Sequence, residues 1–138
     1  MTYFADQSEV YEYIGELFRE LAADEELAMK FRAADTVVRY EYRKPDAVMT
    51  VKMLADQPLE VVLGGSDLEP EIEMSMDADV AHRFWLGKVN VTIAMARGQI
   101  KARGPVSKIL KLVPLAKPAF GRYRELLERE DREDLLNV

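Results

Sequence analysis

The sequence contains no cysteine, which excludes disulfides, iron–sulfur clusters, cysteine-based zinc sites and thiol catalysis. Glycine and proline are few, with 7 and 6 among 138 residues, as in an ordinary globular chain. No apolar run approaches the ~20 residues of a membrane-spanning helix. The first residues show neither the basic start nor the apolar run of a secretion signal. These absences predict a single globular domain over residues 1–138, located in the cytoplasm.

Catalytic motifs are missing as well. The sequence has no phosphate-binding loop, dinucleotide fingerprint or serine elbow. The only histidine, His82, follows Asp79 by three residues, which predicts a local hydrogen bond on a helix surface and no catalytic pairing. Carboxylates between residues 67 and 79 alternate with apolar residues and therefore predict the wet face of a strand, with no metal site. We predict a protein that is not an enzyme and uses no cofactor.

Acidic side chains are absent from residues 80–124, although the chain has 25 Asp and Glu and a net charge of −6. The same region carries ten of the 19 Lys and Arg residues and is rich in aliphatic side chains, above all between residues 106 and 115. Apolar surface with a local positive potential suits a ligand with a hydrocarbon tail and an anionic head, such as a fatty acid, a fatty acyl-CoA or a lipid surface. A solvated polar face of ordinary helices is the alternative. Nucleic acid is disfavoured, because no stacking aromatic residues lie among the cations.

Apolar periodicity predicts helices first and strands afterwards. Residues 10–21 repeat at helical spacing, and Asp24 is placed to cap a short second helix. From Thr36 the period changes to two, and four strands joined by short turns up to residue 77 predict an antiparallel sheet with one apolar face.

The second half of the chain is divided by glycine and proline. A helix is predicted to end at Gly87, and residues 98–104 are predicted to form a strand bounded by glycines. Residues 90–96 fit either a strand or a helix. Pro105 and Pro118 each predict the start of a C-terminal helix, with Pro114 ending or bending the first one. Residues 129–138 are predicted to be a charged, frayed tail.

Four short motifs point to a known family. They are MSMDAD at 74–79, FWLGKVN at 84–90, RGQIKARG at 97–104 and LKL at 110–112. In this order they resemble the sterol carrier protein type-2 family, over about residues 10–127. The chain departs from the family pattern at Val91, where proline is common, and at Pro105, where Asp or Asn often follows the last glycine.

The resemblance implies an α+β fold in which helices cover a five-stranded, mainly antiparallel sheet. An apolar tunnel between sheet and helices would accept sterols, fatty acids, fatty acyl-CoA or other lipids, and residues 90–96 would be helical. The implied function is a lipid carrier, in transient contact with a membrane or a partner enzyme. The alternative is an accessory module that docks an enzyme of isoprenoid-quinone or lipid metabolism through the C-terminal amphipathic helices.

Site residues follow from the apolar faces of these elements together with the resemblance. We expect residues 106–120 to form a lid over the tunnel. The residues expected to line the tunnel are Met49, Val51, Met53, Leu59, Val61, Met74, Met76, Trp85, Ile109, Leu112, Leu115 and Phe120. Methionine and tryptophan also serve as plain core, so this alternative stays open for the methionines and Trp85. An anionic headgroup is expected at Lys101, Arg103, Lys108 and Lys111.

Overall fold

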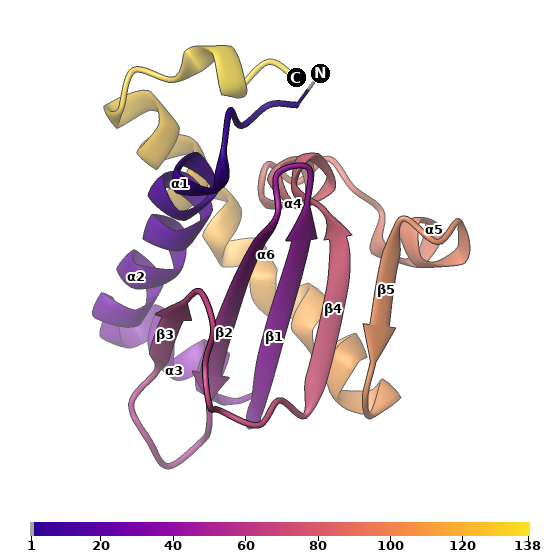
Figure 1. The fold of residues 1–138 in the computed structure, drawn as a ribbon. Coiled ribbons are helices and arrows are strands. Elements are labelled where there is room, and N and C mark those ends of the chain that lie inside the picture. The colour runs from indigo at the N-terminus through magenta and orange to yellow at the C-terminus, as the bar shows by residue number, and fades with distance from the viewer. Residues whose placement is uncertain (1) are drawn as a thin grey trace.

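The computed structural model describes residues 2–138, and its centre is a five-stranded sheet in the order β3-β2-β1-β4-β5 (Figure 1). The strands are β1 (Thr36–Arg43), β2 (Ala47–Met53), β3 (Glu60–Leu63), β4 (Ile72–Asp77) and β5 (Ile100–Arg103). All neighbouring strands pair antiparallel except β1 and β4, which are parallel. The mainly antiparallel sheet expected from the sequence is thus confirmed.

The connection from β3 to β4 differs from the expected succession of short antiparallel turns. The short strand β3 is an edge strand, half-buried along most of its length. Residues 64–71 then return across the end of the sheet, so that β4 lies on the other side of β1, parallel to it (Figure 1). This central place buries Ile72 and Met76. The apolar residues of β4 gain more burial there than beside an edge strand.

Three helical segments precede the sheet: α1 (Gln7–Val10) with the π-helical turn η1 (Tyr11–Gly15), α2 (Glu16–Ala23) and α3 (Glu25–Arg32). Asp6 caps the start of α1 and Asp24 the start of α3, because the two carboxylates accept hydrogen bonds from the backbone N–H groups of Glu9 and Leu27. Helix α4 (Ala78–Trp85) follows β4, and residues 91–96 form helix α5 (Val91–Ala96), which agrees with the helical alternative.

The C-terminal half is dominated by one helix, α6 (Val106–Arg129). The prediction of two helices was wrong, because Pro114 and Pro118 both lie inside α6. Each proline removes one helical N–H donor, yet the helix continues because its inner face is buried in the core. The residues that bury it include Ala116, Ala119, Tyr123, Leu126 and Leu127.

The tail after α6 is ordered, contrary to the expected fraying. The 3-10 turn η2 (Glu133–Leu135) buries Leu135. The guanidinium of Arg132 donates to the hydroxyl of Tyr13 at 2.9 Å and lies over its ring. The Lys88 ammonium donates to the backbone oxygens of Leu136 and Val138. The charges of this segment are thus used in contacts with distant parts of the chain, which its local composition does not reveal.

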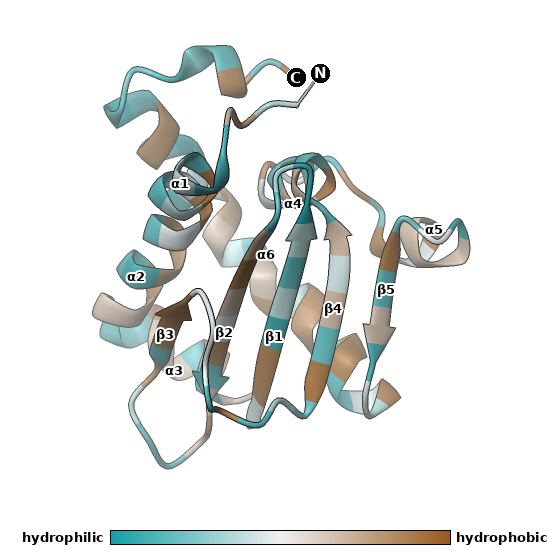
Figure 2. Ribbon diagram, in the orientation of Figure 1, coloured by the Kyte–Doolittle hydropathy of each residue, from teal (hydrophilic) through white to brown (hydrophobic). Residues whose placement is uncertain are grey.

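The core lies between the sheet and the helices, which cover the far face of the sheet in Figure 1. Strand β1 alternates buried Val38, Tyr40 and Tyr42 with exposed Glu41 and Arg43 at its end. Figure 2 shows the same change between hydrophobic and hydrophilic residues along the strands and along α6. Among residues 2–138, no helix has the length and apolar character to cross a membrane.

Candidate ligand-binding cavity

A cavity of about 50 Å³ lies between the covered face of the sheet and helices α3 to α6. Its walls are apolar or aromatic throughout. The lining residues are Phe31, Tyr40, Tyr42, Met53, Met74, Met76, Ala81, Phe84, Trp85, Val91, Ile100, Ile109, Leu112, Val113 and Ala116.

Strand register brings the floor of the cavity together. Tyr40 lies beside Met74, and Met76 lies between Tyr42 and Ile100, so side chains of three neighbouring strands share one face. The roof comes from α6, where residues 109, 112, 113 and 116 recur at helical spacing. The helical spacing on α6 and the alternation along the strands therefore assemble a continuous apolar surface from segments far apart in the sequence.

An aromatic group closes the side formed by α4. The rings of Phe84 and Trp85 meet edge to face at 4.9 Å, and Phe18 packs on the indole from the N-terminal side at 5.2 Å. Phe120 lies behind this pair, 5.6 Å from Phe84. These contacts fix the indole of Trp85 against the cavity, because edge-to-face pairs hold aromatic rings in defined orientations.

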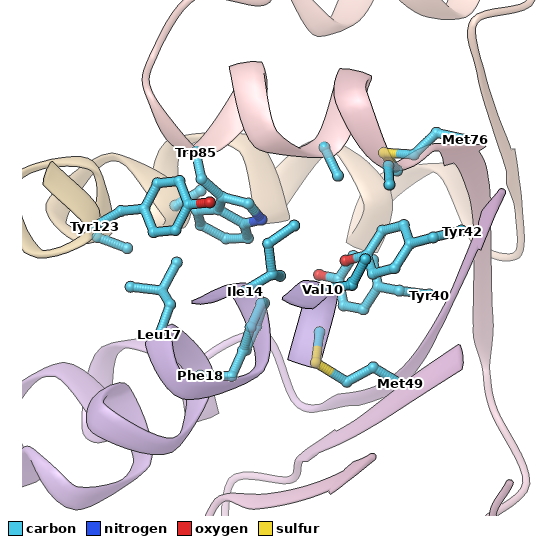
Figure 3. Close-up of a cluster of buried hydrophobic side chains, with 14 of the residues drawn as sticks. Val10, Ile14, Leu17, Phe18, Tyr40, Tyr42, Met49, Met76, Trp85 and Tyr123 are labelled. Carbon is cyan, nitrogen blue, oxygen red and sulfur yellow. The ribbon is translucent and has the colours of Figure 1, made fainter. Parts of the chain in front are cut away.

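The structure brings only part of the predicted lining set to the cavity. The residues that line it are Met53, Met74, Met76, Trp85, Ile109 and Leu112. The predicted residues that lie elsewhere are Met49, Val51, Leu59, Val61, Leu115 and Phe120. Met49 and Val51 are fully buried members of the core, and Figure 3 shows Met49 in the same cluster as Phe18 and Ile14. Ligand contact by any of these residues stays a prediction.

Several lining residues were not predicted, among them Tyr40, Tyr42 and Ile100. A signal for the two tyrosines is present in the sequence, since they share the inner face of their strand with Val38. Ile100 opens the strand bounded by glycines and faces inward for the same reason of alternation. The lining by Phe31 and Ala81 depends on helix packing and has no local signal.

The four cations expected at a headgroup are not gathered at the cavity. Lys101 and Arg103 alternate with the inward-facing Ile100 and Ala102, so they point to the outer face of the sheet. Arg103 pairs there with Glu73 at 3.8 Å. Lys111 is exposed on α6. A headgroup role for these side chains stays a prediction that the geometry does not favour.

Lys108 is held by an ion pair at the start of α6. Its ammonium donates to the backbone oxygen of Asp35 at 2.8 Å and to the carboxylate of Glu71 at 3.0 Å. The hydroxyl of Thr36 donates to the same carboxylate, and this bond, followed by the bond from Lys108, lowers the pKa of Glu71. Lys108 thus joins the start of α6 to the segments that precede β1 and β4.

His82 is fully buried, so the expected position on a helix surface was wrong. Its Nε2–H donates to the backbone oxygen of Leu135 at 2.8 Å, because a carbonyl can only accept. Its Nδ1 accepts from the hydroxyl of Tyr123 at 2.7 Å. Burial lowers the pKa of His82, which keeps the ring neutral. Both ring nitrogens therefore serve to join α4, α6 and the tail.

Comparison with known proteins shows which solved structures share this fold. No protein-family model matches the sequence, and no curated protein does either. Among solved structures, the sterol carrier protein domain 2 of Helicoverpa armigera has a TM-score of 0.66 at 21% identity, covering 88% of this chain and 95% of that one. Sterol carrier protein 2 from Yarrowia lipolytica, in its apo form, has a TM-score of 0.64 at 16% identity, covering 77% and 88%.

A third structure, the "UbiJ-SCP2 Ubiquinone synthesis protein", has a TM-score of 0.59 at 16% identity, with 84% and 95% covered. These neighbours share the arrangement of sheet and helices across most of their length. The chain therefore has the fold of sterol carrier protein 2 domains, as its motifs suggested.

Proposed function

We propose that this chain is a lipid-binding protein that carries a fatty acid, a fatty acyl-CoA or a related lipid with its hydrocarbon part in the cavity. The observation that carries the proposal is the apolar and aromatic lining between sheet and helices. The names of the structural neighbours, sterol carrier proteins, support it. Each methylene group moved from water into such a cavity contributes about 0.8 kcal/mol, offset by the loss of freedom on association.

The size of the cavity sets a condition on this function. By a comparable measure one water needs about 10–15 Å³, so about 50 Å³ receives only a few methylene-sized groups. A long chain therefore requires the cavity to widen. Helix α6 is the element suited to move, because Pro114 and Pro118 leave the carbonyls of Leu110 and Pro114 without their helical donors. Bending there breaks fewer hydrogen bonds than elsewhere in the helix.

The lining also supports a carrier over an enzyme. Within the described residues, the cavity wall contains no charged side chain and no histidine. General acid–base catalysis needs a group that takes up or releases a proton near neutral pH within hydrogen-bond reach of the substrate. The buried tyrosines do not meet this need, since burial raises the pKa of Tyr40 and of Tyr42.

Lipid uptake can be followed through Trp85, the only tryptophan. A fatty acid titrated to micromolar concentration should change its emission, because the indole lines the cavity. Ala116→Leu fills the cavity from α6 and should weaken uptake about tenfold or more, whereas Ala96→Leu makes the same change at an exposed site on α5. An unchanged emission, together with no lipid mass in native mass spectrometry, would count against lipid binding.

A second candidate, docking of a partner enzyme through α6, has one specific observation in its favour. Val106 and Leu110 lie one helical turn apart and are 69% and 60% exposed. Deleting α6 would not test this, since Tyr123 and Leu126 belong to the core. Leu110→Glu, with Ser107→Glu as an exposed control, should instead abolish binding to a purified partner identified from the host while lipid uptake remains. Retained binding by Leu110→Glu would count against docking through this face.

A further inference from the structure

Two phenol side chains line the cavity, and the hydroxyl of one of them has no hydrogen-bond partner among residues 2–138. Tyr42 is 3% exposed, and its hydroxyl is buried without a partner. Tyr40, two residues earlier on β1, is 8% exposed, and burial alone raises its pKa. Their rings stack with centroids 6.1 Å apart. Figure 3 shows both rings extending from β1 in the same direction.

Three other phenols in or beside the core are satisfied. The hydroxyl of Tyr13 accepts from Arg132, that of Tyr11 donates to the backbone oxygen of Val48, and that of Tyr123 bonds His82. A buried hydroxyl without a partner loses its hydrogen bonds to water and gains none in return, so native structures rarely retain one. The exception among the phenols is Tyr42, which lines the cavity together with its stacked neighbour Tyr40. Thr50, whose buried hydroxyl also lacks a partner, lies on the other side of its strand from Met49 and Val51.

The surroundings define the group that these hydroxyls can bind. Their high pKa values keep both phenols protonated near neutral pH, so each offers an O–H donor. The lining contains no Lys, Arg or His within the described chain. A carboxylate or phosphate placed here would be buried without a counter-charge, which is strongly unfavourable. An uncharged oxygen carries no such penalty, and it can accept a hydrogen bond from a phenol in the same geometry as a carboxylate oxygen.

We propose that the cavity binds a lipid whose inner end carries an uncharged oxygen, such as a ketone, an aldehyde or an alcohol, and that Tyr40 and Tyr42 donate hydrogen bonds to this oxygen. The inference rests on the proposed lipid-binding function and narrows its ligand. The lipid enters with its polar end toward β1, and its hydrocarbon part lies under α6 against Ile109 and Leu112. An anionic lipid can enter only tail first, with its head outside.

Three probes with eleven-carbon chains separate these cases: methyl nonyl ketone, undecane and undecanoate. Each is titrated against the wild type, Tyr42→Phe and Tyr40→Phe, with Trp85 emission as the readout. Loss of one hydrogen bond should weaken ketone binding roughly fivefold in each variant. Binding of undecane and undecanoate should not weaken, because neither places an acceptor at the phenols.

The ligand-free variants give a second readout that a purely structural role would not produce. Tyr42→Phe removes an unsatisfied hydroxyl and should leave the melting temperature unchanged or raised while ketone binding falls. Tyr13→Phe is the matched control, since it removes a phenol oxygen that is bonded by Arg132 outside the cavity. It should lower the melting temperature and leave ketone binding unchanged.

The result that would overturn the inference is an unchanged ratio of ketone to alkane affinity in both Tyr40→Phe and Tyr42→Phe, as a resident water on the hydroxyls would produce. Equal weakening of undecanoate would overturn it too, because the hydroxyls would then hold an anion. In both cases lipid binding itself stands. If none of the three probes binds at all, the lipid-binding function fails together with this inference.

Discussion

Acidification from about pH 7.5 to about pH 5.5 should destabilise this protein through His82. In the folded state the ring donates one hydrogen bond to Leu135 and accepts another from Tyr123. A proton on Nδ1 would remove the acceptor and place a charge in the core, between the tail and α4. The unfolded chain has no such restriction and takes up the proton freely.

The magnitude follows from the linkage between protonation and folding. Burial is the largest influence and lowers the pKa of His82 below 6.5; the bond to Leu135 and the nearby Asp79 oppose this, while Lys88 and Arg132 add to it. The unfolded state binds more protons than the folded state below pH ~6.5, so the full free energy of unfolding is reached only above that pH. It declines as the pH falls from there toward the lower folded pKa. The limiting slope is about 1.4 kcal/mol per pH unit.

Urea unfolding at several pH values between about 5 and 8 measures this slope. His82→Gln keeps one donor and one acceptor but cannot titrate, so its free energy of unfolding should vary less over this range. The lowered pKa values of Asp24, Glu71 and Asp134 act at more acidic pH and do not confuse the comparison. Parallel pH profiles for the wild type and His82→Gln, or a wild type that gains stability on acidification, would refute the reasoning.

Four further substitutions test the packing by urea unfolding. Gly104→Ala should cost about 2–3 kcal/mol or more, because its φ is +133° and a Cβ would lie 2.6 Å from the Glu71 oxygen; Gly98→Ala, in open space, should cost about 1 kcal/mol. Lys108→Met breaks a half-exposed ion pair and should cost less than about 1 kcal/mol. Leu135→Ala should cost about 2–4 kcal/mol if the tail is core; a loss under about 0.5 kcal/mol would contradict that packing.

The sheet and much of the cavity floor were accessible from the sequence, because alternation along a strand decides which side chains share a face. Met74 and Met76 were assigned to the inner face on this ground and line the cavity. Alternation does not say which helix covers a given strand. Met49 obeys the same pattern, yet it lies in the part of the core that includes Phe18 and Ile14 (Figure 3). Core and cavity residues are therefore indistinguishable until the helices are placed.

Contacts between distant segments account for the other differences. The charges of the tail predict fraying, but the guanidinium of Arg132 donates hydrogen bonds to Tyr13 and Glu9, more than a hundred positions away. The burial of His82 depends on Leu135 in the same manner. β4 lies beside β1 because β3 is an edge strand of the sheet, and no pattern within either strand reveals this. Local periodicity carries no information on such pairings.

The short strands at both ends of the sheet bear on how the protein behaves at high concentration. β3 and β5 have four residues each, and β5 presents Lys101 and Arg103 beside its outer edge. An edge this brief and charged offers few free amide and carbonyl groups to a second sheet. Fibril growth by strand addition is thereby discouraged, and concentrated solutions should stay clear of cross-β aggregates.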